Sequence, residues 1–300
     1  MTYDNSVLYF SDTYGSIAAD LPALIRGAND AVAYYDSGEQ RAEALVIRSQ
    51  ALNVVGRYLT QVRQFDLAHV AAKGAIEDAK VAGDNIVAAS GVGGMCWLLI
   101  RSQRFDEAED IAVASMDAVE PKIMGATADQ YATWGGLAME AAAAAVRNNR
   151  PEEARALRRA ASTAAQAVGK GHKNLLRHWS RFGPVTVAMK ELEDHMITGD
   201  ARSVIRKSKA DEALQEKHWP RLGGPSTNDG HRYRLDLARA YVRTGDATAA
   251  MEELTHLDEA APEWFRHQAS AAITFEEITK KRRTLTTDMR EVGSHLGIFT

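Results

Sequence analysis

The chain has 300 residues, of which 45% are hydrophobic and 25% charged; this composition is typical of a folded globular protein and excludes a disordered one. Its formal net charge of -4 provides no overall attraction to nucleic acid, whose protein partners usually present a basic surface. The single cysteine, Cys96, excludes an intrachain disulfide framework and a cysteine-based zinc site, and it fits a reducing cytosol.

The first residues, 1–15, are predicted to form an N-terminal extension and not a targeting signal. Asp4 stands where a secretory signal would carry positive charge, and polar residues interrupt any apolar run that follows. No segment of the chain reaches the roughly 18 to 20 uninterrupted apolar residues that are needed to cross a bilayer. We therefore expect a cytoplasmic protein with no membrane partner.

Beyond this extension, apolar residues recur with the helical period, and no segment alternates as a β-strand would. Asp84 is suited to cap the start of one helix, and Pro151 opens another. Gly83, Gly199 and Gly245 stand where helices end in a left-handed conformation. The predicted helices span residues 16–36, 39–63, 65–82, 85–103, 105–119, 126–148, 151–169, 184–198, 200–214, 231–244, 246–260, 263–281 and 285–296.

A short motif occurs twice, as Thr198-Gly199-Asp200-Ala201 and as Thr244-Gly245-Asp246-Ala247. Each copy lies between two amphipathic stretches, so it joins the two helices of a hairpin. A helical hairpin that recurs along a chain cannot bury its apolar face alone and must stack on its neighbours. The motif therefore indicates a repeat architecture.

The tetratricopeptide pattern, in which small residues lie where the two helices of a hairpin cross, can be followed through five units. Successive units are 40 to 50 residues apart, longer than the repeat of about 34 residues that is usual for this pattern. We predict an all-α fold, a TPR-like helical-hairpin solenoid with a right-handed superhelix, as a single domain over residues 16–300. The five units are centred on Ala68, Ala108, Ala154, Val204 and Ala250.

The histidines do not have the spacing of a metal site. His172 and His178 are six residues apart, and His256 and His267 are eleven apart. Two metal ligands on one helix face usually have the i, i+4 spacing. Solvated or locally bonded histidines are therefore favoured, and we expect no metal.

Two further candidates for chemistry also fit structural roles. Cys96 occupies the small-residue position that Gly56 holds one repeat earlier, which favours a packed thiol over a reactive one. The run Gly91-Val92-Gly93-Gly94 lies inside a predicted helix with no preceding strand, so it lacks the context of a phosphate-binding loop. We find no Ser-His-Asp or paired-carboxylate arrangement. We therefore expect a protein that is not an enzyme and requires no cofactor.

The first helices of the hairpins in a tetratricopeptide array line its concave face, where such proteins usually bind ligands. Asparagine pairs with a peptide backbone, arginine binds carboxylates, and tryptophan and methionine provide apolar pockets. The alternative is that the arginines form an ordinary solvated face. The predicted ligand-binding groove comprises Asn53, Arg57, Gln61, Trp97, Arg101, Met139, Arg147, Arg239 and Arg243, and the same face includes Thr60, Ile100, Met189, Glu193, Arg232 and Leu235.

Several short segments resemble actinobacterial transcriptional regulators that join an XRE-type helix-turn-helix domain to a tetratricopeptide sensor. The resemblance extends over nearly the whole chain and implies a module that senses a ligand and dimerises. The segments that carry it are Leu21-Pro22-Ala23-Leu24-Ile25, Trp179-Ser180-Arg181-Phe182-Gly183-Pro184-Val185-Thr186-Val187-Ala188, Arg232-Tyr233-Arg234-Leu235-Asp236-Leu237-Ala238-Arg239-Ala240-Tyr241 and Val292-Gly293-Ser294-His295-Leu296-Gly297-Ile298.

The sequence departs from that family at its start. Only twenty residues precede Leu21, too few for a helix-turn-helix domain, so we expect no specific DNA binding by this chain itself. Nucleic acid would be contacted only through a separate or missing domain. The basic run Lys280-Lys281-Arg282-Arg283 suits the dipole at a helix C-terminus and is expected to be solvated.

The expected function is therefore that of a sensor module that forms a homodimer. A peptide or a small hydrophobic signal would enter the groove and change the tilt of the stacked hairpins, with residues 170–200 as the flexible point. The alternative is a free-standing adaptor whose groove holds the peptide tail of a partner protein. The two differ in enclosure, because a signal pocket should be bounded by neighbouring helices and a tail groove should be open at both ends.

Overall fold

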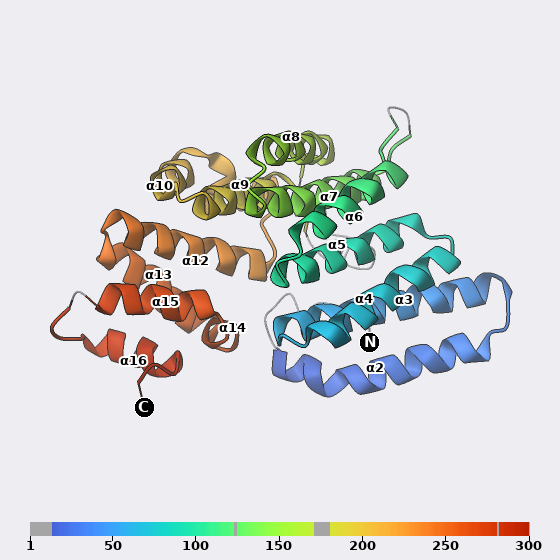
Figure 1. Ribbon diagram of the computed structural model, residues 1–300, viewed down its shortest axis with the longest axis horizontal. Helices are drawn as coiled ribbons and strands as arrows, with labels where there is room; N and C mark the ends of the chain where they lie inside the picture. Colours follow the sequence, from blue (N-terminus) through green and yellow to red (C-terminus); the bar gives the residue numbers. More distant parts are fainter. Residues whose placement is uncertain (1–13, 123–124, 171–180, 281, 300) are drawn as a thin grey trace.

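The computed structural model describes residues 14–122, 125–170, 181–280 and 282–299, which are helical and contain no β-strand (Figure 1). The predicted all-α class is thus confirmed. None of the helices in these ranges is long and apolar enough to cross a membrane. In chain order the α-helices are α2 (Tyr14–Tyr34), α3 (Gly38–Gln61), α4 (Phe65–Val81), α5 (Asn85–Arg101), α6 (Phe105–Ala118), α7 (Ala128–Arg147), α8 (Pro151–Val168), α9 (Pro184–Ile197), α10 (Ala201–Ala210), α11 (Trp219–Leu222), α12 (Thr227–Thr244), α13 (Ala247–Ala260), α14 (Pro262–Arg266), α15 (Ala269–Thr279) and α16 (Thr287–His295).

Several predictions lie wholly or partly outside the described residues. Most of the N-terminal extension, residues 1–13, is among them, as is the part of the predicted flexible point between 171 and 180. His172, His178 and Trp179 belong to that second segment.

Two predicted helices end early for local reasons. The helix expected over 200–214 stops at Ala210, because Asp211 is extended (ψ 120°) and its side chain accepts a hydrogen bond from Ala213 N, which starts a short 3-10 turn. The helix expected over 263–281 is divided at Gln268, whose ψ of 102° separates α14 from α15. Both interruptions follow from one residue leaving the helical region of backbone conformation.

Several short turns between consecutive helices share a left-handed residue, as predicted for Gly83, Gly199 and Gly245. Their φ values are 76°, 85° and 92°. Glycine adopts this conformation without steric cost, whereas other residues pay for it. Three turns nevertheless place a residue other than glycine there: Arg63 (φ 63°), Gln103 (φ 62°) and Asn149 (φ 57°).

The helices form two layers. α3, α5, α7, α9, α12 and α15 contact one another in that order, and α4, α6 and α8 each pack against the helices before and after them. Small residues lie where the layers cross, as predicted. A Cβ on Gly56 would be 3.5 Å from Ala68 O, and at the matching crossing Cys96 Sγ is 3.4 Å from Ala108 O. Cys96 is 0% exposed, so its predicted role as a packed thiol is confirmed.

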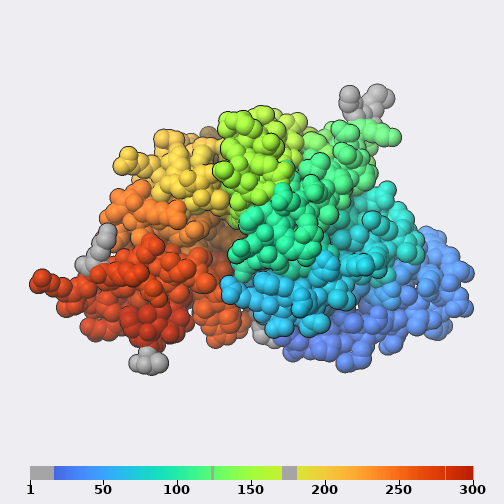
Figure 2. Space-filling view, in the orientation of Figure 1, coloured from blue at the N-terminus to red at the C-terminus, as the bar shows by residue number. Residues whose placement is uncertain are grey.

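The two ends of the described chain contribute to one hydrophobic core. Ile17 and Leu21 of α2 and Val54 of α3 belong to the same cluster as Trp264 and Phe265 of α14. We call this cluster, which also includes residues of α12, α13, α15 and α16, the shared core. Figure 2 shows the orange-to-red C-terminal region and the blue N-terminal region on neighbouring sides of the lower part of the molecule. The first hairpin therefore packs against the last ones as well as against its sequence neighbours.

Candidate functional site

The layer of helices that contains α5, α7, α9 and α12 lines a cavity of about 480 Å³. We call it the central cavity. Its size is within the range of pockets that hold small organic ligands. Its wall carries five cationic side chains and two carboxylates beside two aromatic rings. The lining residues are Arg63, Phe65, Trp97, Ile100, Arg101, Gln103, Glu140, Ala143, Arg147, Lys190, Glu193 and Arg232.

Three of the nine predicted groove residues meet at this cavity. Trp97 and Arg101 reach it from the last turns of α5, and Arg147 reaches it from the end of α7. Ile100, Glu193 and Arg232, which the sequence places on the same face, also line it. The cavity thus combines residues from hairpins that are far apart in sequence.

Four predicted residues are used elsewhere. Met139 is 6% exposed and packs in the alanine-rich core of α5–α8, so its side chain does not line the central cavity. Arg243 donates a hydrogen bond to Met196 O at the end of α9 (3.2 Å). Arg239 pairs with Asp236 (2.6 Å). Asn53 is 3% exposed, and its Oδ1 is 2.6 Å from the position of a Cβ on Gly94, so it fills the crossing of α3 and α5.

The remaining two, Arg57 and Gln61, lie one turn apart on α3 and carry buried polar atoms. Arg57 Nε and Gln61 Oε1 are without a hydrogen-bond partner in the described part of the chain. Such atoms cost free energy when they are removed from water unmatched. Arg57 acts electrostatically on Glu140 of the cavity wall, so its charge belongs to the same site.

Glu193 organises the charges of the cavity wall. Its Oε1 is 2.5 Å from Arg147 Nη2, and its Oε2 is 2.9 Å from Lys190 Nζ. Burial acts to raise the pKa of Glu193, but Lys190 and Arg147 outweigh it and hold that pKa well below its usual value. Both carboxylate oxygens are therefore engaged, and the three groups together carry one net positive charge.

Two other carboxyl groups near this network have raised pKa values. Burial raises the pKa of Glu140, against the opposing charges of Lys190 and Arg57. Burial also raises the pKa of Asp236 to about 6, with Glu193 adding to the effect and Arg239 opposing it. Both shifts have the same main cause, because burial disfavours the charged form of a carboxyl group.

A larger cavity, of about 810 Å³, adjoins the central one. It lies between the ends of α3 and α5 on one side and α14 and α15 on the other. Arg63 and Arg101 line both cavities, so the two cavities are neighbours. Gln61 lies in this outer part, as do Arg266 and His267.

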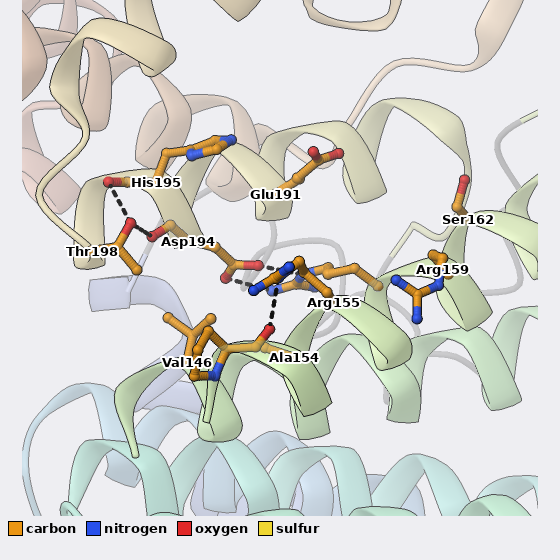
Figure 3. A pocket seen from close by; sticks show the side chains of 11 residues that line it. Val146, Ala154, Arg155, Arg159, Ser162, Glu191, Asp194, His195 and Thr198 are labelled. Atoms are coloured by element: carbon orange, nitrogen blue, oxygen red, sulfur yellow. Dashed lines mark hydrogen bonds and ion pairs between the residues drawn. The ribbon is translucent and has the colours of Figure 1, made fainter. Parts of the chain in front are cut away.

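A third cavity, of about 430 Å³, lies between α8 and α9 (Figure 3). Its floor holds Arg158 and Asp194, joined by two hydrogen bonds of 2.6 and 2.8 Å. Glu191 at its edge pairs with Lys207, and Arg155 pairs with Glu152. Because most of its charges are matched within the protein, this cavity fits a role in bracing α8 against α9.

The helical residues that sequence reasoning missed lie one position along from the predicted ones. On α7 the cavity face is Glu140, Ala143 and Arg147, and on α9 it is Lys190 and Glu193. The predicted face began one residue earlier in each helix, at Met139 and Met189. One residue corresponds to about 100° around a helix. The polar residues Glu140 and Arg147, seven residues or about two helical turns apart, are the signal that would have found this face.

The turn residues Arg63 and Gln103 were missed for a different reason. They lie in turns outside the helices, where the backbone is left-handed, and both line the central cavity. In the residues that the structure describes, no group of three or more His, Cys, Asp or Glu side chains is placed to hold a metal ion. Comparison with known proteins finds no family model that matches the chain and no curated protein similar to it.

Proposed function

We propose that this chain is a TPR-like helical-repeat sensor module that binds a small ligand in its central cavity. The observation that carries the proposal is the convergence of Trp97, Arg101 and Arg147, residues chosen from sequence as ligand-binding, on one cavity of about 480 Å³. The binding event would act on an attached or separate DNA-binding domain, as in the regulators that the sequence resembles. Dimerisation of the module belongs to the same proposal.

The repeat architecture is supported by the equivalence of successive hairpins. Gly56 against Ala68 and Cys96 against Ala108 form the same crossing one unit apart. Short turns with a left-handed residue recur at the hairpins, and the helices of one layer contact one another in chain order. These are the features expected of stacked helical hairpins.

Backbone strain at the cavity also favours a binding role. Arg63 and Gln103 hold a left-handed conformation that costs about 1–2 kcal/mol for a residue with a side chain, and both line the central cavity. The equivalent residue in three other turns is glycine. Strain that persists where glycine would relieve it points to a function for the side chain.

The shape of the site favours the sensor over the adaptor. Residues of α5, α7, α9 and α12 line the central cavity, and residues of α14 and α15 line the neighbouring one. A groove for a protein tail would run open from one end of the array to the other. Here the first hairpin and the last helices contribute to the shared core, which limits the length of chain that such a groove could accept.

Native mass spectrometry of the full chain purified from its host tests the proposal. We expect a retained small molecule in the native protein and in the control variant Arg104→Gln. Arg104 lies next to Gln103 in the same turn, but its guanidinium pairs with Glu107 on the exposed surface. Trp97→Leu and Arg101→Gln should both lose the ligand while keeping the helical circular dichroism spectrum.

Two results would contradict this function. A small molecule that stays bound in both cavity variants would place the site elsewhere. A co-purifying protein with no small molecule, retained through the same residues, would replace the sensor with the adaptor.

A further inference from the structure

We propose that this chain forms a homodimer through the outer face of α4, with α4 of one copy lying antiparallel against α4 of the other. The inference rests on the proposed function, which includes dimerisation, and it names the surface and the register of the contact. We call this surface the α4 stripe. It comprises Leu67, Val70, Lys73, Glu77 and Val81.

The α4 stripe exposes three large apolar side chains. Leu67, Val70 and Val81 are 58%, 70% and 75% exposed. Val70 and Val81 are eleven residues apart, close to three helical turns, so they point in nearly the same direction, and Leu67 lies about one turn before Val70. Single apolar side chains scattered over a surface are ordinary, but a group of them on one helix face indicates a contact surface.

The packing of α4 within the chain does not account for the stripe. α4 packs mainly against α3 and α5, and the side that it turns to them carries small buried residues, Ala68, Ala72 and Ala75. The outer side points away from these crossings. The described chain therefore leaves most of the surface of Val70 and Val81 uncovered.

The equivalent positions of α6 are charged. α6 begins 40 residues after α4, with the same Phe-Asp pair. With that offset, Glu107 and Asp110 of α6 correspond to Leu67 and Val70 of α4, and both acidic side chains are exposed. The repeated hairpin thus accepts charge at these positions. The apolar residues on α4 are not required by the hairpin, which favours a role in a contact with another molecule.

The two charged residues of the α4 stripe are available to a partner. Lys73 and Glu77 stand one turn apart between Val70 and Val81. Their side chains are 67% and 63% exposed, and Lys73 Nζ is 3.7 Å from Glu77 Oε1. An exposed ion pair of this kind contributes little to stability by itself. Each group can therefore turn to an opposite charge on a second molecule at little cost.

One antiparallel register satisfies both the charged and the apolar residues. When the two helices cross at the level of residue 75, Lys73 of each copy faces Glu77 of the other. In the same register Val81 of each copy lies opposite residue 69 of the other, between that copy's Leu67 and Val70. A two-fold interface requires this reciprocity, because every contact in it occurs twice. The stripe is thus complementary to itself, and this property selects a second copy of the chain as its partner.

The size of the stripe indicates a weak dimer. α4 has 17 residues and is about 25 Å long. One pair of such helices buries less than the roughly 1,200 Å² of total surface at which stable interfaces begin. The equilibrium between monomer and dimer should therefore depend on protein concentration.

Analytical ultracentrifugation of the full chain from about 1 μM to about 1 mM tests the contact, because weak interfaces associate in this range. We expect the native protein to pass from monomer to dimer as its concentration rises. Val70→Lys should weaken the dimer roughly tenfold or more, since each dimer would place two added charges in the contact. Ile273→Lys is the matched control. Ile273 is 57% exposed on α15, away from the stripe, so this variant should dimerise as the native protein does.

Charge variants test the register. Lys73→Glu should weaken the dimer several-fold, because only acidic groups then meet at the centre of the contact, and Glu77→Lys should do so with basic groups. The double variant Lys73→Glu, Glu77→Lys should restore the dimer, because each pair across the contact again has opposite signs. Circular dichroism shows whether each variant is folded. A double variant that dimerises no better than the single ones would exclude this register.

The outcomes separate the dimer surface from the rest of the proposed function. A monomer at every concentration overturns both the surface and the dimerisation, and leaves ligand binding to its own test. A dimer that Val70→Lys does not weaken overturns the α4 stripe, while dimerisation stands through another surface. Val70 does not line the central cavity, so Val70→Lys should retain the ligand in native mass spectrometry. If Trp97→Leu also retains it while Val70→Lys loses the dimer, the binding site fails and the dimer surface stands.

Discussion

The regions α5–α8 and α12–α16 pack their helices with side chains of opposite size. In the first, fully buried alanines such as Ala112, Ala138 and Ala161 form much of the core. In the second, Phe265 and Phe275 are fully buried with other large side chains. Small residues allow helices to lie close together but leave no space for an added atom, whereas large residues fill wider gaps and leave a void when they are shortened.

The difference teaches that hydrophobic content alone does not describe a helical core. The size of the side chain at each crossing sets the distance between neighbouring helices. It also decides whether adding or removing atoms does harm. Added atoms should therefore destabilise α5–α8, whereas removed atoms should destabilise α12–α16.

The largest effect is expected from shortening a large side chain in α12–α16. Phe265→Ala should lower the free energy of unfolding by about 3–5 kcal/mol, because Phe265 is 0% exposed in the shared core. Ile273→Ala on α15 is the control. Ile273 is 57% exposed, so this substitution should lower the free energy of unfolding much less. Urea unfolding followed by circular dichroism measures both. Equal losses of unfolding free energy in the two variants would contradict the described burial of Phe265 and exposure of Ile273.

The next largest effect is expected from a buried charge on α12, the first helix of the second region. The pKa of Asp236 is raised to about 6, above the value of about 3.9 for an unfolded chain. Its protonation therefore adds stability that is complete below about pH 4 and is lost as the pH rises through 6. Asp236→Asn removes this titration.

We expect the stability of Asp236→Asn relative to the native protein to increase between pH 4 and pH 7. The increase in the free energy of unfolding should be up to about 3 kcal/mol, from a shift of about two pKa units. Urea unfolding of both proteins at several pH values measures it. A difference that does not change with pH would mean that Asp236 titrates normally.

An added methyl group tests the close packing of α5–α8. A Cβ on Gly135 would be 2.2 Å from the Phe182 ring and 2.8 Å from Ala164 Cβ, so Gly135→Ala should destabilise by about 1–3 kcal/mol. At the next residue, Gly136, no described neighbour lies within 4 Å of the added atom. Gly136→Ala should instead stabilise by up to about 1 kcal/mol through helix propensity. Thermal unfolding of the two variants measures both effects. Destabilisation by both substitutions would contradict the described difference in packing between Gly135 and Gly136.

The smallest effect concerns the strained turns. Gln103→Gly should change the free energy of unfolding by less than about 1 kcal/mol, with stabilisation expected, because relief of a left-handed side chain exceeds the entropic cost of glycine. Asn149→Gly is the control at an equivalent turn that does not line the central cavity. Only Gln103→Gly should reduce ligand retention, as measured by native mass spectrometry. Equal retention would limit the role of Gln103 to the turn.

Much of the helix pattern was predictable because its determinants are local. Asp84 caps α5 by accepting hydrogen bonds from Ile86 N and Val87 N, and Gly245 ends α12 in the left-handed region. Both signals can be found within a few residues of sequence. The interruptions at Asp211 and Gln268 were not predictable, since the hydrophobic period continues through them.

The candidate site was only partly predictable, because a cavity depends on how helices rotate against one another. Trp97 and Arg147 were found from the repeat frame, but a one-residue difference in that frame exchanged Glu140 for Met139. The contact between the ends of the chain had no local signal at all. Val54 and Phe265 share a core across more than 200 residues of sequence.

That contact gives the fold a property that an open stack of helical hairpins lacks. In an open stack the terminal units are held from one side and can fray without disturbing the middle. Here α2 and α3 belong to one core with α12 to α16. The first and the last described helices are therefore each held by contacts with the other. A change in the tilt of one hairpin must be compensated by the others, or it must separate the shared core and expose its apolar surface where both ends of the chain lie.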